Sequence, residues 1–173
     1  MVHTSRQRAV LLDRDGVLNK RPAPGCYVRR WEEFAWLSGA REALHLFAET
    51  DYRVIVVTNQ AGIAKGLITE ETLRGIHARM RSDAEAAGGR IDAVYYCPHT
   101  VDAGCACRKP RPGLIWLAQR EFQLALAETI LIGDDSSDGE AAQTAGCGGW
   151  LHVSEDHSLL DCARQLLLTY SSK

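Results

Sequence analysis

Five short, mostly apolar runs alternate with stretches of helical periodicity along this 173-residue sequence. Each run is followed by polar or turn-forming residues, which is typical of buried strands in a parallel sheet. The intervening stretches carry apolar residues three or four positions apart, as amphipathic helices do. The predicted strands are 9–12, 53–58, 91–96, 129–132 and 149–153, and the predicted helices begin near residues 40, 69, 112, 138 and 159. This alternation predicts an α/β fold with helices on both faces of a parallel, Rossmann-like sheet, giving three layers.

The composition narrows the classes of protein to which this chain can belong. Its 20 basic and 22 acidic residues give a net charge of −2, without a basic stripe that would suit nucleic acid. No apolar stretch reaches membrane length, and the apolar run after Arg8 is too short for a signal peptide. Residues 1–173 therefore suit a single soluble, cytoplasmic domain with no nucleic-acid or membrane partner, and the lack of an internal repeat favours a monomer.

Polar side chains gather where three of the predicted strands end. In chain order they are Asp13, Asp15, Thr58, Asn59, Asp134 and Asp135, and the loop before residue 112 adds Arg108 and Lys109. Because parallel strands bring their carboxyl ends to one edge of the sheet, these side chains are expected to meet. Clustered carboxylates suit Mg²⁺, and Thr58, Asn59 and Lys109 could donate to phosphoryl oxygens. A solvated acidic turn is the alternative at any one of these strand ends, but their combination indicates phosphoryl transfer.

Two further stretches are expected to shape this edge. Residues 19–38 are irregular, rich in proline and aromatic residues, and are interpreted as a lid fastened to the domain. Residues 97–107 contain three cysteines and a histidine, namely Cys97, His99, Cys105 and Cys107. Three thiolates and an imidazole form a closed tetrahedral set, which predicts a structural Zn²⁺ site rather than a catalytic one. Free or disulfide-linked thiols are the alternative. Zinc would stiffen the loop that presents Arg108 and Lys109.

Four short segments resemble the motifs of the haloacid dehalogenase-like (HAD) superfamily and appear in the same order. They are Asp13-Arg14-Asp15-Gly16, Thr58-Asn59-Gln60, Arg108-Lys109-Pro110, and Gly133-Asp134 with Asp138. The acid two positions after Asp13 resembles the phosphatase branch of this superfamily. Only 45 positions separate Asp13 from Thr58, and 51 separate Thr58 from Lys109, so neither interval has room for a cap domain. The expected fold is therefore HAD-like and capless.

The resemblance also implies a role for each motif residue. Asp13 would be the nucleophile that forms an aspartyl-phosphate, and Asp15 would be the general acid and then the general base. Thr58 and Lys109 would hold the phosphoryl group. The Mg²⁺ ligands would be the Asp13 side chain, the Asp15 backbone carbonyl and the Asp134 side chain, and Asp138 would orient that shell.

The zinc loop resembles that of one subgroup, which contains heptose-bisphosphate phosphatases and histidinol-phosphatases and cannot be divided by this loop. The stretch from Thr58 to Gly66 and the lid segment Gly25-Cys26-Tyr27-Val28 favour the heptose enzymes, although the lid carries one inserted residue. The implied substrate is thus a phosphorylated sugar, a heptose 1,7-bisphosphate. Its implied contacts are Asn59, Gln60, Ala61, Arg108, Gly25, Tyr27 and the residue at position 135.

Two features keep other substrates open. The lid is longer and richer in proline than the heptose-enzyme pattern, and Asp135 stands where those enzymes usually carry a substrate-binding lysine. An anion at this position would disfavour a highly charged bisphosphate. The alternatives are a phosphatase for histidinol phosphate or another small phosphomonoester and, from a different class, a non-catalytic zinc-bearing binding module. The combination of Asp13, Asp15, Lys109 and Asp134 argues against the binding module, because a pure binder does not need all four.

Overall fold

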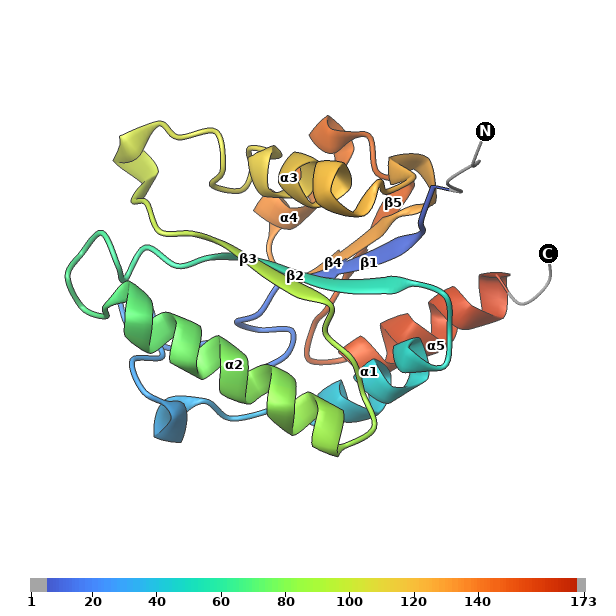
Figure 1. The fold of residues 1–173 in the computed structure, drawn as a ribbon, viewed down its shortest axis with the longest axis horizontal. Helices are drawn as coiled ribbons and strands as arrows, with labels where there is room; N and C mark the ends of the chain where they lie inside the picture. The colour runs from blue at the N-terminus through green and yellow to red at the C-terminus, as the bar shows by residue number, and fades with distance from the viewer. Residues whose placement is uncertain (1–5, 171–173) are drawn as a thin grey trace.

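The computed structural model describes residues 6–170 and contains a five-stranded parallel sheet in the order β3-β2-β1-β4-β5 (Figure 1). The central strand β1 pairs with β2 and β4, with Val10 opposite Val54 on one side and Ile130 on the other. The strands are β1 (Ala9–Leu12), β2 (Arg53–Asn59), β3 (Ala93–Cys97), β4 (Ile130–Gly133) and β5 (Gly149–His152). The α-helices are α1 (Ala40–Ala48), α2 (Glu70–Ala86), α3 (Gly113–Phe122), α4 (Ser136–Ala145) and α5 (Leu159–Tyr170). The predicted α/β class is confirmed.

Helices cover both faces of the sheet, with α1, α2 and α5 on one face and α3 and α4 on the other (Figure 1). Successive side chains of a strand point to opposite faces. Accordingly, Val10 and Leu12 belong to the core under α1, α2 and α5, whereas Ala9 and Leu11 belong to the core under α3 and α4. Because both faces are buried, β1 has to be apolar at every position, which explains its continuous apolar run.

The observed elements begin within two residues of their predicted starts, and local polar contacts explain the differences. The third strand begins at Ala93 rather than at residue 91, because the Asp92 carboxylate is engaged by Arg53, Arg90 and the amide of Val54. The fourth helix begins at Ser136 rather than at residue 138. Asp135 caps it by accepting a hydrogen bond from the Ser137 amide, and the Asp138 carboxylate accepts one from the Asp135 amide.

The predicted lid, residues 19–38, is fastened at its second half and exposed at its first. Trp31 stacks on Phe34 at 4.8 Å between ring centroids, and Trp36 packs edge-on against Phe34. The Trp36 indole also donates to Asp83 of α2. The short 3₁₀ helix η1 (Trp31–Glu33) lies within this aromatic group. The aromatic residues thus anchor the segment to the domain, as the sequence predicts, and leave residues 20–27 at the sheet edge.

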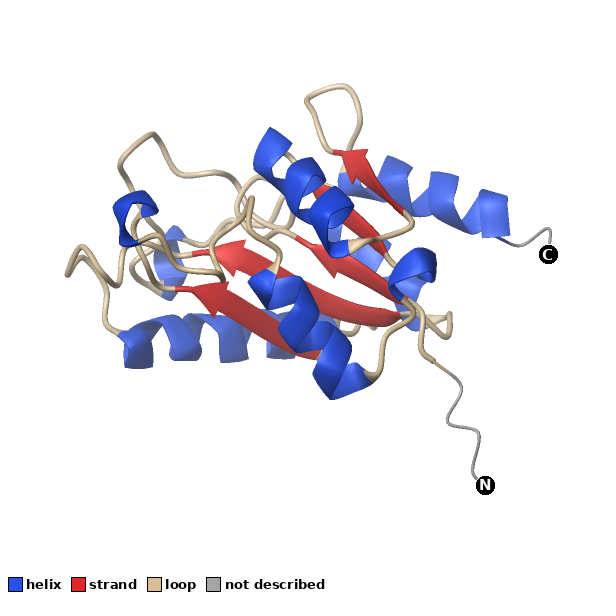
Figure 2. Ribbon diagram, turned by 90° about the horizontal axis from the view of Figure 1, so that it is seen from above, coloured by secondary structure: helices blue, strands red, loops and turns tan. Residues whose placement is uncertain are grey.

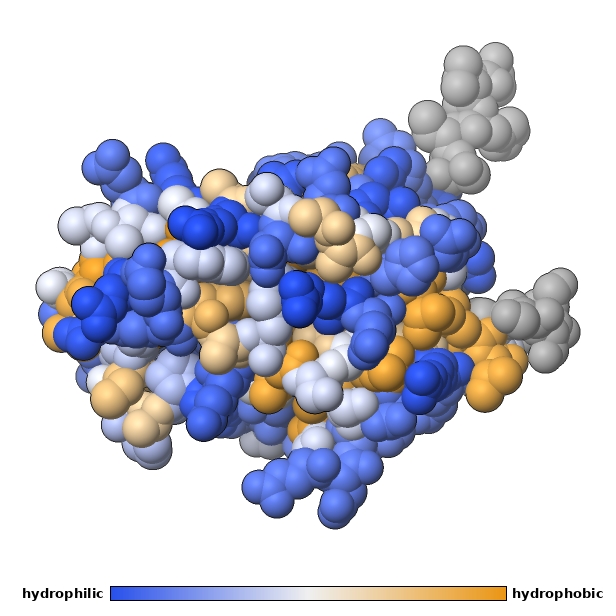
Figure 3. All heavy atoms as spheres, turned by 90° about the horizontal axis from the view of Figure 1, so that it is seen from below, coloured by the Kyte–Doolittle hydropathy of each residue, from blue (hydrophilic) through white to orange (hydrophobic). Residues whose placement is uncertain are grey.

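Long loops gather at the carboxyl ends of the strands, toward which the arrowheads point (Figure 2). The interval between β1 and β2 holds η1 and α1, and the interval between β2 and β3 holds α2, so neither contains an inserted domain. On the α1/α2/α5 side the surface is largely hydrophilic, with an apolar area near the C-terminus (Figure 3). That area includes a groove lined by Leu46, Leu160, Leu167 and Leu168. Within residues 6–170, no helix is long and apolar enough to cross a membrane.

Candidate active site

A cavity of about 560 Å³ opens at the carboxyl edge of the sheet. The residues that line it come from the loop after β1, the end of β2, the loop before α3 and the start of α4. Most of the residues predicted from sequence are among them, namely Asp13, Asp15, Gly25, Tyr27, Thr58, Asn59, Arg108, Lys109 and Asp135. The sheet therefore brings together motifs that lie far apart in the chain, as expected for a site at the carboxyl ends of parallel strands.

A buried lysine stands at the centre of this edge. The Lys109 ammonium lies 3.0 Å from Asp13 Oδ1 and 2.6 Å from Asp138 Oδ1, and it donates to the Val57 carbonyl at 2.8 Å. Burial alone would lower the pKa of Lys109, but the charges of Asp13 and Asp138 raise it above its usual value. Lys109 is therefore a fixed positive charge beside Asp13, where an incoming phosphoryl group would need one.

Three carboxylates converge around this lysine. Oxygen atoms of Asp13, Asp134 and Asp138 lie within 4.8 Å of one another. Burial and the charge of Asp13 raise the pKa of Asp134 to about 6, although Arg21 opposes the shift. Carboxylates this close repel one another unless a cation lies among them, and an all-oxygen set suits Mg²⁺. The donor set therefore fits the predicted metal. Asp138, expected to orient the shell, lies within the cluster itself.

Five hydrogen bonds hold the Asp15 carboxylate, and three of them come from Arg14. The Arg14 side chain is fully buried and reaches both Asp15 oxygens at 2.9–3.2 Å, while Asn19 and Gln60 add bonds at 2.9 and 2.8 Å. Burial alone would raise the pKa of Asp15, but these donors lower it below its usual value. Asp15 is therefore positioned and ionised in this structure.

Arg14 is itself fixed from behind by α2. Its Nη1 lies 3.0 Å from the Nε2 of His77, a buried residue on that helix. Burial and the charge of Arg14 lower the pKa of His77 to about 3, so the ring is neutral. His77 Nε2 is then the acceptor for Arg14, and Nδ1 carries the proton. Arg14, the middle residue of Asp13-Arg14-Asp15, therefore has a positioning role, because it holds the Asp15 carboxylate in place.

The end of β2 supplies side chains with three different tasks. Thr58 lines the cavity, and its hydroxyl accepts a hydrogen bond from the Gln60 amide at 3.0 Å. The Asn59 side chain makes two 3.1 Å hydrogen bonds to the backbone of Lys109. Gln60 and Ala61 are buried and do not line the cavity. The side-chain amides of Asn59 and Gln60, which could have contacted a ligand, are therefore engaged by neighbouring residues of the site.

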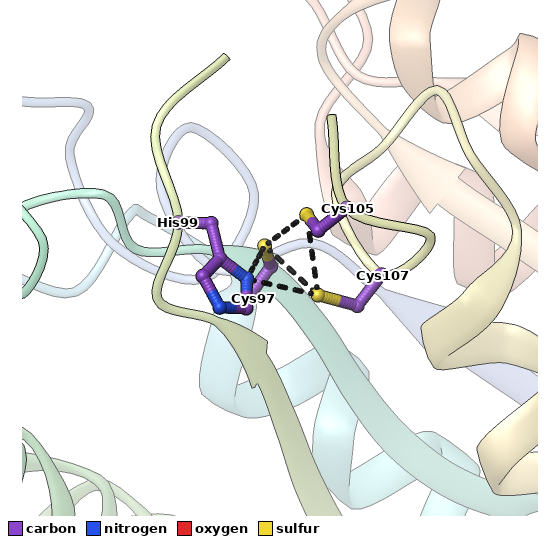
Figure 4. A group of neighbouring side chains, drawn as sticks. All are labelled: Cys97, His99, Cys105 and Cys107. Carbon is purple, nitrogen blue, oxygen red and sulfur yellow. Dashed lines mark hydrogen bonds between the residues drawn. The ribbon is translucent and has the colours of Figure 1, made fainter. Parts of the chain in front are cut away.

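The predicted zinc ligands form one compact group at the end of β3 and in the loop that follows it (Figure 4). Five of the six distances among the Sγ atoms of Cys97, Cys105 and Cys107 and the Nδ1 of His99 range from 3.2 to 3.6 Å, and all four atoms lie within 4.8 Å of one another. Tetrahedral zinc ligands lie roughly 3.5–3.8 Å from one another, whereas a disulfide is about 2.05 Å long. The cysteines are free, and their arrangement fits the donor set of a closed structural zinc site.

This cysteine loop is tied to the cavity by backbone contacts. The Arg108 guanidinium donates to the His99 carbonyl at 3.1 Å, and the backbone N–H of Gln60 donates to the Cys97 carbonyl at 2.7 Å. Arg111 donates to the Cys105 carbonyl at 2.7 Å, and its side chain also lines the cavity. Order in the loop is therefore linked directly to the placement of the basic side chains.

Comparisons with known proteins agree with this geometry. Residues 106–164 match the model of the HAD-hydrolase-like family. The D-glycero-beta-D-manno-heptose-1,7-bisphosphate 7-phosphatase of Bordetella bronchiseptica is 39% identical over 144 residues, which are 83% of this chain and 79% of that protein. The D-glycero-alpha-D-manno-heptose-1,7-bisphosphate 7-phosphatase of Mycobacterium tuberculosis is 41% identical over 79% of this chain and 72% of its own. The chain belongs to the family of HAD-like phosphatases.

A solved structure extends the family likeness over nearly the whole chain. The D,D-heptose 1,7-bisphosphate phosphatase of B. bronchiseptica, crystallised with magnesium and phosphate, has a TM-score of 0.85 and 35% identity. The alignment covers 94% of this chain and 99% of that one. The predicted HAD-like fold and the prediction of a phosphoric monoester hydrolase are confirmed. Membership of this enzyme family also argues against the non-catalytic binding module.

Some residues of this HAD-like phosphatase site were not singled out from the sequence. Arg21 lies 2.8 Å from Asp134, and Arg111 lines the cavity. Asn19 and His77 stand behind Asp15, the first directly and the second through Arg14. Arg111 could have been found from the sequence, because it is the second arginine of the segment Arg108-Lys109-Pro110-Arg111. Arg21, Asn19 and His77 lie outside the motifs, and only the folded chain brings them to the acids.

Proposed function

We propose that this chain is a magnesium-dependent phosphatase that removes the 7-phosphate of D-glycero-D-manno-heptose 1,7-bisphosphate. The observation that carries the proposal is the contact of Lys109 with Asp13 at a cavity that Asp15 and Thr58 also line. A nucleophilic carboxylate, a fixed cation and a proton-transferring acid are the groups that phosphate-ester hydrolysis requires. The names of the relatives at 35–41% identity support the heptose substrate.

In the first step, a carboxylate oxygen of Asp13 attacks the phosphorus atom of the ester. The bond between phosphorus and the sugar oxygen breaks, and Asp15 gives its proton to that leaving oxygen. Lys109 and the Thr58 hydroxyl hold the phosphoryl oxygens as charge develops on them. Because Arg14, Asn19 and Gln60 lower the pKa of Asp15, the approach of the negatively charged substrate must supply the shift that protonates it.

In the second step, water attacks the phosphorus of the aspartyl-phosphate. Asp15 takes a proton from the water, the bond between Asp13 and phosphorus breaks, and inorganic phosphate leaves. The hydrogen bonds from Arg14 and Gln60 keep the Asp15 carboxylate in place for both transfers. The acid is thereby regenerated together with the free Asp13 carboxylate, and the cycle is balanced.

Magnesium would be held by the carboxylates of Asp13 and Asp134 and by the backbone carbonyl of Asp15. When bound, it neutralises charge on the phosphoryl oxygens and on the clustered acids. The ion pair of Asp138 with Lys109 supports this shell by keeping the lysine directed at Asp13.

The cavity offers groups for the rest of the substrate. Arg108 suits the second phosphate, because guanidinium pairs with two phosphate oxygens at once. Gly25 and Tyr27 of the lid, together with Asp135, face the remaining space as candidate sugar contacts. Asn59 also lines the cavity, but both ends of its side-chain amide are engaged by the backbone of Lys109. We assign Gln60 to positioning Asp15 and Thr58, since its amide already contacts both.

A panel of substrates tests the proposed function. Purified protein with Mg²⁺ is expected to release phosphate from the alpha and beta anomers of heptose 1,7-bisphosphate faster than from other sugar phosphates. The measurement is kcat/KM by phosphate release, with a magnesium-free reaction as the control. A preference for an ester outside the sugar phosphates, or full activity without a divalent cation, would contradict the proposal.

Histidinol phosphate is the second candidate substrate, and one observation favours it. Asp135 places a carboxylate at the cavity wall, and its side chain is 45% exposed. Such a carboxylate would pair with the amino group of histidinol phosphate. If Asp135 has this role, Asp135→Asn should reduce kcat/KM for histidinol phosphate and not for the heptose bisphosphate.

We also propose that Cys97, His99, Cys105 and Cys107 bind one structural zinc ion. Cys107→Ser is expected to lower the zinc content from about one ion per chain to near zero. It should also lower activity, because the same loop carries Arg108 and Lys109. Cys147→Ser, which changes a partly buried cysteine outside the group, is the matched control. A zinc-free preparation with full activity and wild-type thermal stability would refute the structural role.

A further inference from the structure

Arg21 is a lid residue whose guanidinium reaches across the sheet edge to the acids of the site. Its Nη2 lies 2.8 Å from Asp134 Oδ1, and its Nη1 lies 3.7 Å from Asp135 Oδ2. The side chain also lines the cavity and is half exposed. Arg21 therefore contacts one predicted magnesium ligand and one predicted substrate contact at the same time.

The charges explain why the guanidinium lies there. Asp13, Asp134 and Asp138 form a cluster of three carboxylates, and the buried Lys109 pairs with two of them, Asp13 and Asp138. Arg21 pairs with the third, so it supplies positive charge where the cluster still has an excess of negative charge. A metal ion bound by Asp134 would meet that same need, and two cations at one carboxylate repel each other.

Close packing around Asp134 leaves Arg21 and a metal ion to compete for the same carboxylate oxygen. A side-chain carbon placed on Gly16 would lie only 1.8 Å from Asp134 Oδ2, so that oxygen is packed against the backbone of the loop after β1. Oδ1 is the oxygen that Arg21 contacts. Asp134 thus has one crowded oxygen and one that the guanidinium engages, and a cation that approaches the carboxylate has to contend with Arg21.

The Arg21 side chain can change partner without a movement of the lid backbone. Asn19 is fully buried and bonded to Asp15, and the Lys20 amide donates to the Ala35 carbonyl at 2.8 Å. Pro22 follows directly and restricts the backbone. The backbone on both sides is therefore fixed, while the half-exposed side chain can rotate within the cavity toward the space near Arg108.

We infer that Arg21 is a specificity residue that pairs with Asp134 and Asp135 in the magnesium-free enzyme and binds the non-reacting phosphate of a bisphosphate once magnesium is bound. This inference rests on the proposed function for the identity of that phosphate. It also accounts for the anion at position 135. Arg21 pairs with Asp135 in the magnesium-free enzyme and, once magnesium is bound, supplies to the phosphate the cation that position 135 lacks.

Arg21→Gln separates the two parts of the inference. Calorimetric titration with Mg²⁺ alone, on zinc-loaded protein, is expected to give a Kd about two- to fivefold tighter than wild type, because a competing exposed cation has been removed. The KM for heptose 1,7-bisphosphate should rise about tenfold or more, with little change in kcat, because a charge-assisted hydrogen bond to phosphate is lost. The KM for heptose 7-phosphate, which lacks the second phosphate, should change less than about twofold.

Two further variants sharpen the result. Arg21→Lys keeps the positive charge and should restore most of the discrimination between the two sugars. Arg30→Gln removes an exposed arginine of the same lid that pairs with Glu33 away from the cavity, and it should match wild type in both assays. An unchanged magnesium Kd in Arg21→Gln, or an equal rise in KM for both substrates, would overturn the inference. If wild type hydrolyses neither sugar, the proposed function fails, and the magnesium titration still decides whether Arg21 competes at Asp134.

Discussion

Asp13→Asn is expected to lower the rate of phosphate release at least about a thousandfold, which is the scale on which loss of a covalent nucleophile acts. Asp13 is the acid at the cavity that contacts the fixed charge of Lys109, so the substitution replaces the attacking carboxylate by a neutral, far less nucleophilic amide and leaves the surrounding groups in place. The measurement is kcat on the heptose bisphosphate with saturating Mg²⁺. Asp13→Ala should show a loss of the same order.

Loss of activity in Asp13→Asn is not expected to reflect unfolding. Lys109 keeps its 2.6 Å contact with Asp138, and removal of one carboxylate relieves repulsion in the cluster. The melting temperature in magnesium-free buffer should therefore stay close to that of wild type. Asp51→Asn, at an exposed position paired with Arg8, is the control for loss of an acidic charge elsewhere. If Asp13→Asn retained more than about a tenth of the wild-type rate, another group would have to be the nucleophile.

Lys109→Met should have the largest effect on stability. Removal of the ammonium leaves Asp13 and Asp138 buried without their cation, a change that typically costs about 3–5 kcal/mol of unfolding free energy. For a chain of this size, that corresponds to a fall in melting temperature of roughly 10 °C or more. Thermal unfolding in magnesium-free buffer is the measurement. Lys65→Met, at an exposed lysine, should shift the melting temperature little.

A second substitution and a change of pH test the cause of that loss. Adding Asp138→Asn to Lys109→Met removes one unpaired charge and should recover part of the stability. Burial raises the pKa of Asp138, which Lys109 opposes in the wild type. A carboxyl whose folded-state pKa lies above its unfolded value destabilises the fold at higher pH, and this penalty disappears as the pH falls below both values. The gap between Lys109→Met and wild type should therefore narrow toward pH 4. If the difference in stability between Lys109→Met and wild type did not change with pH, the loss would be due to packing and not to the unpaired charge.

The position of the site could be predicted because strand ends are visible in the sequence. The apolar run before Asp13 identifies β1, and the runs before Thr58–Asn59 and Asp134 identify its neighbours β2 and β4. Once these strands are parallel and adjacent, their carboxyl ends have to meet at one edge. The cluster of Cys97, His99, Cys105 and Cys107 was predictable for a similar reason, since all four lie within residues 97–107 and local chain geometry can bring them together.

The tasks of individual polar side chains could not be predicted in the same way. Asn59 and Gln60 are neighbours in one motif, yet the first holds the backbone of Lys109 and the second holds Asp15 and Thr58. Asn59 and Lys109 are fifty positions apart, and their contact depends on how the loop before α3 folds back over β2. A motif shows that an amide is present, and the packing of distant loops determines which group it meets.

The sequence by itself determined the α/β fold, the edge of the sheet that carries the acids, and the candidates for nucleophile and zinc ligands. These features follow from apolar periodicity and from short-range spacing. Only the tertiary structure decided that Arg14 and His77 support Asp15 and that Arg21 pairs with Asp134. Those contacts join residues from different elements, 63 and 113 positions apart for Arg14–His77 and Arg21–Asp134. Arg14 is fully buried and has few other partners, whereas the half-exposed Arg21 is drawn to the carboxylate cluster by its charge.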